Sequence, residues 1–538
     1  MKKSLALILC VVLVLSLFAG CGGKKEEAPA PSQGKTETPA NTEAPKTDLE
    51  GLGTTGAQIK EAAKYEDEFI IGGQIQISAI DPQTYADTYY VTKLVYDPLL
   101  TYSNGEYKPA LATSWEKTGD YTYEFTLRED VTFQDGGKFT ADDVVFTLGE
   151  RVKTVVGSTT AAKLACVEKV EALGDYKVKF TLNSLNQDFL LFMTQPYSVM
   201  LSRKACTADP DKGFFIGTGP WKITDFVPGI KVDMERYDGF WGELPKPSKM
   251  FYVAYPEDNG RVVAIQSGDV DATIALPSTE NENIRNDKTI HGVSILDSGL
   301  AYCCFNTKDP VIGDLNLRKA IAYAIDYDEI IDVVCNGDAE RSGTFWGSGS
   351  YAEYKELKGY DYNLEKAKEY IAKSNYDGST ISIMCAIPSN VTTATILVDR
   401  LADIGVKAVV DERDFVGVIT NTGYGSASYQ MLCFNAMFGE SGDDCCRRMF
   451  YTGESGNKVQ LNDPDLDKKI DEALVETDEA KRIQMYHEIQ EYNIDNVLYL
   501  PLGHSYYYCA EGLNVSGIDW SANSTQHDFR YGCVAIPD

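Results

Sequence analysis

The chain has 538 residues, more than one hydrophobic core usually holds, so we predict roughly two to four domains. Hydrophobic residues make up 43% of the sequence, which excludes a wholly disordered chain. There are 50 Lys and Arg against 80 Asp and Glu, a formal net charge of −30. Such a surface repels phosphate backbones, and this excludes nucleic-acid binding. The chain has only 4 His, which argues against a metal site or a catalytic triad built on histidine.

The N-terminus has the pattern of an export signal. Two lysines, a short apolar run and the small residues Ala19 and Gly20 predict a signal peptide over residues 1–20. The apolar run is short for a permanent membrane span. The segment from Leu17 to Cys21 resembles the bacterial lipobox, which implies a diacylglycerol thioether on Cys21 and an extracytoplasmic protein anchored to the cell membrane by lipid. The alternative is an ordinary secretory signal with an incidental cysteine.

A polar segment separates this signal from the folded body. Residues 22–50 consist largely of Pro, Ala, Thr, Glu and Lys, a composition typical of a solvated tether. We therefore predict that residues 21–64 are the lipidated cysteine and a disordered linker. A strand opening near Glu68 predicts the start of the folded body.

The cysteines show no disulfide framework. Of 13 Cys, Cys10 leaves with the signal and Cys21 carries the lipid, so 13 − 2 leaves 11, an odd number. No Cys-x-x-Cys occurs, and several cysteines lie in strand-like apolar runs, where a thiol packs as a small hydrophobic group. We predict free, buried thiols.

The body alternates strand and helix patterns, which predicts a mixed α/β fold. Asn363 and Thr140 are predicted helix caps. The predicted strands are 121–127, 176–182, 231–236, 249–254 and 301–306, and the predicted helices are 317–334, 363–374, 394–404, 463–476 and 478–495.

Five groups of motifs follow one another from about residue 65 to the C-terminus. They resemble the large extracytoplasmic solute-binding proteins of ABC importers, family 5, which include dipeptide-, oligopeptide- and nickel-binding proteins. The motifs are 108–116 with 122–128, 131–136 and 139–146; 217–221 with 235–236 and 240–242; 261–273; 305–307 with 317–326; and 462–467 with 499–502.

The resemblance implies a two-lobe clamshell of the periplasmic-binding-protein type (type II, cluster C), with an inserted subdomain in the first lobe. It implies a first lobe of residues 65–103, 215–288 and 505–538, an inserted subdomain of 104–214 and a second lobe of 289–504. Two crossing strands would act as the hinge. The aromatic residues of the inserted subdomain, such as Phe125 and Phe133, are interpreted as core packing.

The same resemblance implies a protein that captures a dipeptide or oligopeptide in the interlobe cleft and delivers it to a cognate ABC permease with its ATPase. An oligosaccharide is the alternative ligand, and nickel is the third. A surface receptor or adhesin that uses the clamshell without import is the alternative function. No cofactor is implied.

No enzyme motif is present in the sequence. The chain lacks a Gly-x-Ser-x-Gly elbow, a His-Glu-x-x-His helix and a Walker loop. Asp269 and Asp271 have the spacing that begins a calcium loop, but the other ligands of such a loop are missing. We predict a turn into a strand there, no metal site and no catalytic activity.

Candidate ligand-binding residues follow from the resemblance. Matching the glycine- and acid-rich loop after the strand near residue 433 places Glu440 at the acid that pairs with a ligand amine, with Asp443 as the second acid of the loop. Met437 stands where the family commonly has Trp. The other candidates are aromatic or acidic residues at the expected cleft edge: Tyr85, Asp87, Tyr89, Phe345 and Trp346. Arg447 and Arg448 are candidates for binding a carboxylate, the alternative being that they balance local acid.

Overall fold

The computed structural model describes residues 59–84, 88–103, 105–155, 159–347, 350–426, 428–437, 439, 441–521 and 527–537. The predicted signal peptide, Cys21 and most of the predicted linker lie outside these residues. The first regular strand, β1, begins at Glu68, where the sequence pattern predicts the start of the folded body. In the part of the chain that is described, no helix is both long and apolar enough to span a bilayer.

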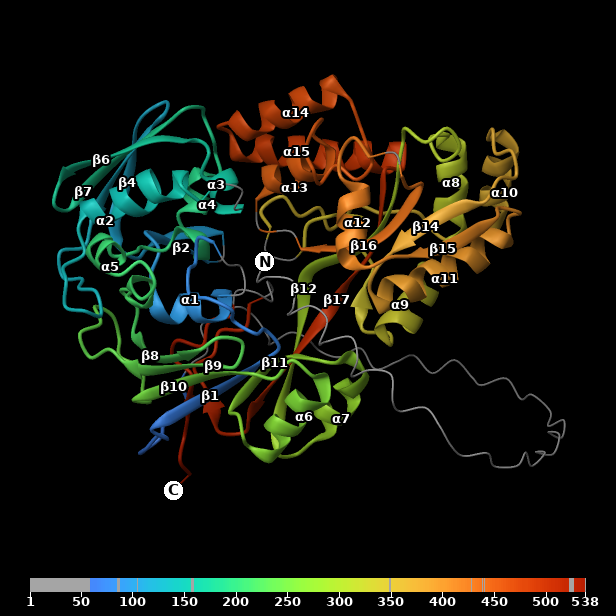
Figure 1. The fold of residues 1–538 in the computed structure, drawn as a ribbon. Coiled ribbons are helices and arrows are strands. Elements are labelled where there is room, and N and C mark those ends of the chain that lie inside the picture. Colours follow the sequence, from blue (N-terminus) through green and yellow to red (C-terminus); the bar gives the residue numbers. More distant parts are fainter. Residues whose placement is uncertain are drawn as a thin grey trace, which may run out of the picture. The chain divides into compact units, whose positions relative to one another are not determined.

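A single mixed sheet organises most of the body (Figure 1). β1 pairs in parallel with β10 and β11, and β14 pairs in parallel with β15 and β16. In sheet order the strands are β15 (Ala408–Glu412), β14 (Ile381–Cys385), β16 (Met431–Met437), β12 (Ile290–Phe305), β17 (Tyr499–Gly512), β11 (Ala272–Leu276), β1 (Glu68–Gly73), β10 (Lys249–Ala254), β9 (Lys231–Arg236) and β8 (Trp221–Val227), and β13 (Ala339–Glu340) pairs with β17.

Two long antiparallel strands connect the two halves of this sheet. β12 has 16 residues and β17 has 14. Their pairing is regular up to Leu296 opposite Tyr506 and resumes at Leu300 opposite His504, with a register irregularity between. We call the part built on β1 and β8–β11 the first lobe, and the part built on β14–β16 the second lobe. The irregularity in β12 therefore lies where the chain passes between the lobes.

Helices cover both faces of the second lobe because its strands bury alternate residues on opposite faces. Cys303 belongs to the hydrophobic cluster under α8–α11, and its neighbours Tyr302 and Cys304 belong to the cluster under α12–α15. These helices are α8 (Leu315–Ala324), α9 (Tyr327–Cys335), α10 (Leu364–Lys373), α11 (Pro388–Ala402), α12 (Phe415–Thr422), α13 (Gly442–Phe450), α14 (Pro464–Val475) and α15 (Glu479–Asn496).

The first lobe has its own core around β1 and β10. Phe69, Trp221 and Met250 are fully buried there. Trp221 donates its indole N–H to the carbonyl of Arg530, 2.9 Å away, which ties the C-terminal segment to this core. The elements beside this core are α1 (Tyr89–Val95), α5 (Arg203–Ala208), α6 (Asp258–Ser267), α7 (Asn281–Asn286), β18 (Val515–Ser516) and β19 (Cys533–Val534).

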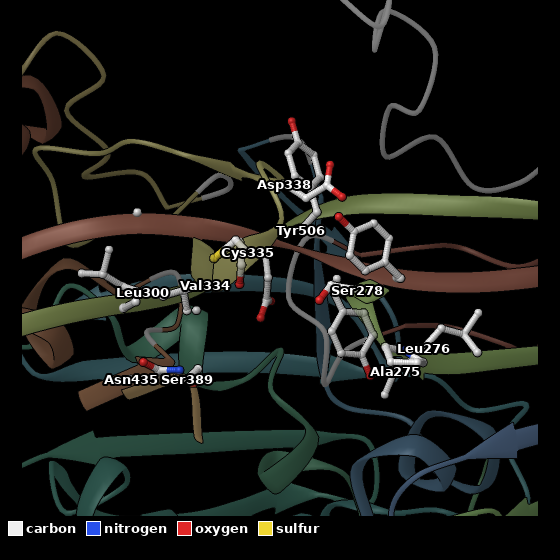
Figure 2. A pocket seen from close by; sticks show the side chains of 18 of the residues that line it. Ala275, Leu276, Ser278, Leu300, Val334, Cys335, Asp338, Ser389, Asn435 and Tyr506 are labelled. Carbon is white, nitrogen blue, oxygen red and sulfur yellow. The ribbon is translucent and has the colours of Figure 1, made fainter. Parts of the chain in front are cut away.

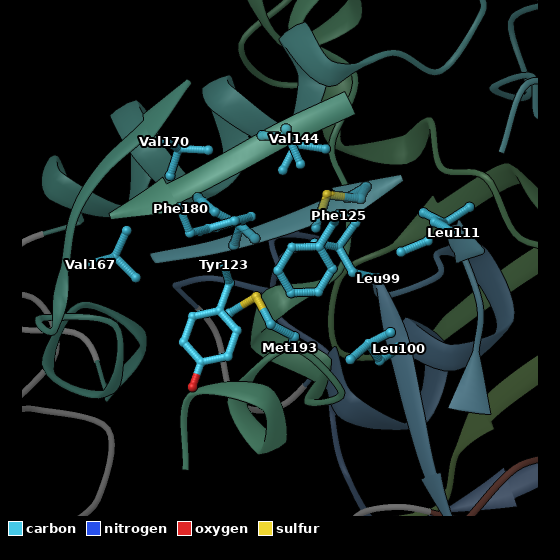
Figure 3. Close-up of a cluster of buried hydrophobic side chains, with 14 of the residues drawn as sticks. Leu99, Leu100, Leu111, Tyr123, Phe125, Val144, Val167, Val170, Phe180 and Met193 are labelled. Carbon is cyan, nitrogen blue, oxygen red and sulfur yellow. The ribbon is translucent and has the colours of Figure 1, made fainter. Parts of the chain in front are cut away.

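A separate four-stranded antiparallel sheet, in the order β4-β5-β7-β6, carries the core shown in Figure 3. Phe125 and Phe180 are fully buried with ring centroids 5.3 Å apart. Phe125 and Phe133 pack in this core, as predicted. The elements here are β2 (Leu100–Ser103), β3 (Glu106–Pro109), β4 (Ala112–Gly119), β5 (Thr122–Leu127), β6 (Val167–Gly174), β7 (Lys177–Leu182), α2 (Ala141–Val144), α3 (Thr159–Lys163) and α4 (Phe189–Phe192).

One predicted helix is wrong, and both predicted cap residues, Thr140 and Asn363, lie at helix N-caps. The single helix predicted over 317–334 is two helices, α8 and α9, because Ile325 is extended and the Asp326 carboxylate accepts a hydrogen bond from the Glu329 N–H at 3.1 Å, starting a new helix. Asn363 caps α10, accepting from the Lys366 N–H at 3.0 Å. Asp271 accepts from the Ile70 N–H at 2.7 Å just before β11, which agrees with the predicted turn into a strand.

The eleven cysteines from Cys166 onward are free thiols, and all but Cys335 are buried. Cys303 and Cys433 lie directly opposite one another on β12 and β16, with their sulfurs 3.3 Å apart. Burial raises the thiol pKa of several of these residues, Cys385 to about 12 among them. These thiols pack as small hydrophobic groups.

Candidate functional site

A pocket of about 460 Å³ lies where the two lobes meet the connecting strands (Figure 2). The first lobe contributes the ends of β1 and β11 and the start of α6. The second lobe contributes the end of α9 with Asp338, the first turn of α11 and the end of β16. β12 and β17 form the wall between them. The volume is within the range of small-molecule sites, about 300–1,000 Å³.

The first-lobe wall is held in place by a buried arginine. Arg261 on α6 is 1% exposed, and its guanidinium donates to the carbonyls of Tyr255 at 2.7 Å, Pro256 at 2.9 Å and Ala275 at 2.7 and 2.9 Å. It also pairs with Asp258. Ala275 has a φ of 59°, a left-handed conformation that is costly for a residue with a Cβ. The two hydrogen bonds from Arg261 stabilise that turn at the pocket edge.

The connecting strands contribute a tyrosine-rich wall. Tyr506 donates its hydroxyl to Glu340 at 2.7 Å. The Tyr507 hydroxyl lies 3.3 Å from that of Tyr90 on α1, and burial raises the pKa of Tyr90 to about 12. His504 is buried, with Nδ1 3.0 Å from the Gly299 carbonyl, and burial lowers its pKa. The three tyrosines and His504 are therefore neutral at physiological pH.

The part of the second-lobe wall formed by α11 and β16 presents neutral polar groups. Ser389, Asn390 and Thr393 of α11 line the pocket together with Asn435 near the end of β16. In Figure 2, Ser389 and Asn435 lie at the lower left, away from Asp338 and Tyr506 near the top. The carboxylates that line the pocket, those of Asp258, Asp297 and Asp338, come from other elements. The pocket therefore has an acidic side and a neutral donor side.

Asp443 is committed to an ion pair. It is 8% exposed at the start of α13, and Arg447 donates to both of its oxygens at 3.0 and 3.1 Å. Burial raises the pKa of Asp443 to about 6 although Arg447 opposes that shift. Arg447 also bonds Asp471 at 3.0 Å. Arg447 thus balances local acid, which is the alternative that the sequence left open.

Phe345 and Trp346 are packed in the core of the second lobe. Both are fully buried. The Phe345 ring lies 5.8 Å from that of Phe450 and 5.6 Å from that of Tyr499, and the Trp346 ring lies 6.3 Å from that of Tyr486. The expectation of cleft-facing aromatic side chains is thus corrected for these two rings, because the helices α13 and α15 cover them.

Of the other predicted site residues, Tyr89 is half-buried at the start of α1, and burial raises its pKa. Glu440, Tyr85 and Asp87 lie outside the described residues. Met437 ends β16, directly after the pocket residue Ala436. The backbone of β16 therefore leads from the pocket toward the predicted amine-binding loop.

A buried carboxylate links the four-stranded subdomain to the second lobe. Asp188, before α4, is 3% exposed. It accepts a hydrogen bond from the Tyr351 hydroxyl at 2.9 Å and another from the Ser441 hydroxyl. Burial raises its pKa. Nearby, Lys163 pairs with Asp444 at 2.8 Å.

The sequence did not single out the residues that form this pocket. Arg261 begins the 261–273 motif, and Asn435 lies two residues before Met437, so both were close to segments already recognised. Asn390 carries no motif signal. Within the described ranges, no cluster of three or more His, Cys, Asp or Glu side chains is arranged to hold a metal ion.

Comparison with known proteins identifies the family. Residues 106–453 match the family model "Bacterial extracellular solute-binding proteins, family 5 Middle". The chain is 26% identical over 510 residues to the peptide transport periplasmic protein SapA of Salmonella typhimurium, covering 86% of this chain and 91% of that protein. It is 24% identical over 471 residues to the nickel-binding periplasmic protein of Escherichia coli, covering 81% and 89%.

The fold agrees with solved structures of this class. The ABC transporter substrate-binding protein CtaP from Listeria monocytogenes superposes with a TM-score of 0.80 at 23% identity, covering 88% of this chain and 100% of that one. The mixed α/β architecture is therefore the two-lobe periplasmic-binding-protein fold. The chain belongs to the bacterial extracellular solute-binding proteins of family 5, the substrate-binding proteins of ABC transporters.

Proposed function

We propose that this protein captures a dipeptide or oligopeptide between its lobes and delivers it to an ABC permease. The observation that carries the proposal is the pocket on the connecting strands, lined by both lobes. A ligand that contacts both lobes stabilises the closed form over the open form, which is how a hinged binding protein couples capture to closure. The permease and its ATPase recognise that closed form.

The polarity of the pocket favours a peptide over a metal complex. The described side chains that line the pocket include three carboxylates, two asparagines and three consecutive tyrosines, Tyr506, Tyr507 and Tyr508, and none of them is a histidine. Carboxylates bind amines, amides bind peptide groups, and tyrosine rings cover side chains. His504 is buried against Gly299, and His527 is fully buried with its pKa lowered to about 3 by burial.

Glu440 is the proposed partner of the ligand's terminal amine. It follows β16 by three residues in the acid-rich loop that matches the family pattern. Tyr85, Asp87, Tyr89 and Met437 are proposed to surround the same end of the ligand. Asp443 is proposed to shape the loop through its pair with Arg447.

The proposed anchor is a lipid on Cys21. The lipobox-like segment 17–21 and the polar composition of 22–50 support an extracytoplasmic lipoprotein held near the permease by a solvated tether. The proposed division of the body follows the family: 65–103, 215–288 and 505–538 in the first lobe, 104–214 as the inserted subdomain and 289–504 in the second lobe.

A thermal-shift screen tests the ligand class. Purified mature protein is heated with dipeptides to pentapeptides, with cello- and xylo-oligosaccharides, and with Ni²⁺. A ligand that binds only the folded state at 100 times its Kd stabilises it by about 2.7 kcal/mol and raises Tm. We expect the peptides to raise Tm and to be recovered intact. Stabilisation by an oligosaccharide and by no peptide would replace the peptide assignment within the same family.

The genomic setting tests the importer assignment. A gene beside permease and ATPase genes supports import. A gene beside a sensor kinase supports a receptor that uses the same fold without transport.

A further inference from the structure

The first turn of α11 presents unpaired backbone donors to the interlobe pocket. α11 is 15 residues long and begins at Pro388, which has no N–H. The Val391 N–H bonds the Ile387 carbonyl at 3.0 Å. No described group accepts from the N–H groups of Ser389 and Asn390, and both residues line the cavity. A helix start with free N–H groups attracts an anion.

Among the residues that the structure describes, no side chain caps this helix. The residue at the cap position is Ile387, whose side chain has no acceptor. The N-termini of two other second-lobe helices, α10 and α14, are capped by Asn363 and Asp463. The positive end of the α11 dipole is therefore directed at the pocket without internal compensation.

Asn390 supplies an independent indication of a ligand. The residue is 4% exposed and lines the pocket, yet its amide makes no hydrogen bond to any residue that the structure describes. Its amide therefore faces the pocket with its hydrogen-bonding capacity available to a ligand. Asn435 lies beside Ser389 at the lower left of Figure 2. Among the described residues, its amide also has no hydrogen-bond partner.

The charge distribution selects the kind of anion. Among the described residues that line the pocket, Arg261 is the one basic side chain, and its guanidinium is fully used by three carbonyls and Asp258. Asp258, Asp297 and Asp338 make the rest of the pocket acidic. A doubly charged phosphate would be repelled there, whereas a single carboxylate at the α11 end is compatible with neutral donors.

We propose that the N-terminus of α11, with the amides of Asn390 and Asn435, binds a carboxylate of the captured solute. For the peptide of the proposed function, on which this inference rests, that group is the C-terminal carboxylate. The acidic side of the pocket then accommodates the rest of a zwitterionic ligand.

The test compares each acid with its neutral counterpart. The peptides that raise Tm in the screen are titrated calorimetrically as free acids and as C-terminal amides, and oligogalacturonates are titrated beside cello-oligosaccharides of equal length. A charge-assisted hydrogen-bonded contact predicts that amidation weakens binding roughly 10- to 100-fold. Peptides that bind equally well as acid and amide would overturn the inference and leave the proposed function standing. Oligogalacturonates that bind while no peptide does would retain the carboxylate site and overturn the peptide assignment. If no carboxylate-bearing probe binds, the inference fails.

The variant Asn390→Asp tests whether the effect is on ligand binding and not on the stability of the fold. A carboxylate in the first turn favours the helix dipole, so the ligand-free variant should keep or exceed the wild-type Tm. The same charge repels the ligand carboxylate, so affinity for free acids should fall at least roughly tenfold and affinity for amides much less. Thr395→Asp, on the exposed side of α11, carries the same charge and should bind as the wild type does.

Asn435→Ala is the second variant, because Asn435 is exposed and its loss disturbs no core. It should weaken free acids more than amides. Unchanged discrimination between acid and amide in both variants would overturn the inference.

Discussion

Arg447 holds Asp443 through two parallel hydrogen bonds, Nε to Oδ2 at 3.0 Å and Nη2 to Oδ1 at 3.1 Å. The pair lies within the first turns of α13, and Asp443 is nearly buried. The charge of Asp443, the second acid of the proposed amine-binding loop, is therefore already balanced by Arg447. A ligand amine in this region consequently depends on another carboxylate, and Glu440 is the residue we propose.

Burial of Asp443 predicts a pH-dependent contribution to stability. Its folded pKa of about 6 lies above the ordinary 3.8, so the folded state binds this proton more tightly than the unfolded state does. Its contribution is therefore fully present below about pH 4 and is lost as pH rises through 6, by about 3 kcal/mol in total. Urea unfolding of the wild type and of Asp443→Asn between pH 4 and 8 measures this. The free energy of unfolding of the wild type should fall relative to that of the variant as pH rises. A constant difference would contradict the shifted pKa.

Glu440→Gln should selectively weaken peptides with a free amine. The variant keeps the size of the side chain but removes the charge that pairs with a desolvated ammonium, which predicts a loss of about 2–5 kcal/mol, roughly 30- to 5,000-fold in affinity. Acetylating the peptide should weaken the wild type comparably and the variant much less. Asp443→Asn is the internal control and should have a milder effect. Calorimetric titration measures each, and equal effects of both substitutions would mean that the loop is misaligned.

Cys21→Ser should release the protein from the membrane. A thioether-linked diacylglycerol contributes two acyl chains, enough for stable anchoring, whereas one chain is marginal. Fractionation and immunoblotting should find the wild type with membranes and the variant in the medium or periplasm. A variant that still sediments with membranes would place the anchor elsewhere in the chain.

Asp188→Asn should weaken closure of the lobes. The amide nitrogen cannot accept, so one of the hydrogen bonds from Tyr351 and Ser441 is lost. A smaller closed population lowers apparent ligand affinity in proportion. We expect the affinity of the variant to be roughly three- to tenfold lower than that of the wild type. In small-angle scattering at a subsaturating ligand concentration, the radius of gyration should decrease less for the variant than for the wild type. Asp120→Asn, on an exposed turn, should behave as the wild type does.

Local sequence patterns determined many individual elements of this protein. The strands β9 and β10 have the predicted bounds, 231–236 and 249–254, because alternation of apolar and polar residues is a local property. Asn363 caps α10, as its position before the apolar periodicity indicated. The family motifs were local too, and the family model confirms the class that they predicted.

Tertiary structure decided where the interlobe pocket lies. Arg261, Asn390, Asn435 and Tyr506 are far apart in the sequence, and they meet only because β12 and β17 join the lobes. Trp346 was expected at the cleft, but α15 covers it, since burying a large ring contributes more than exposing it. Side-chain identity predicts what a residue is able to bind, and the packing of distant segments decides which residues remain accessible to do so.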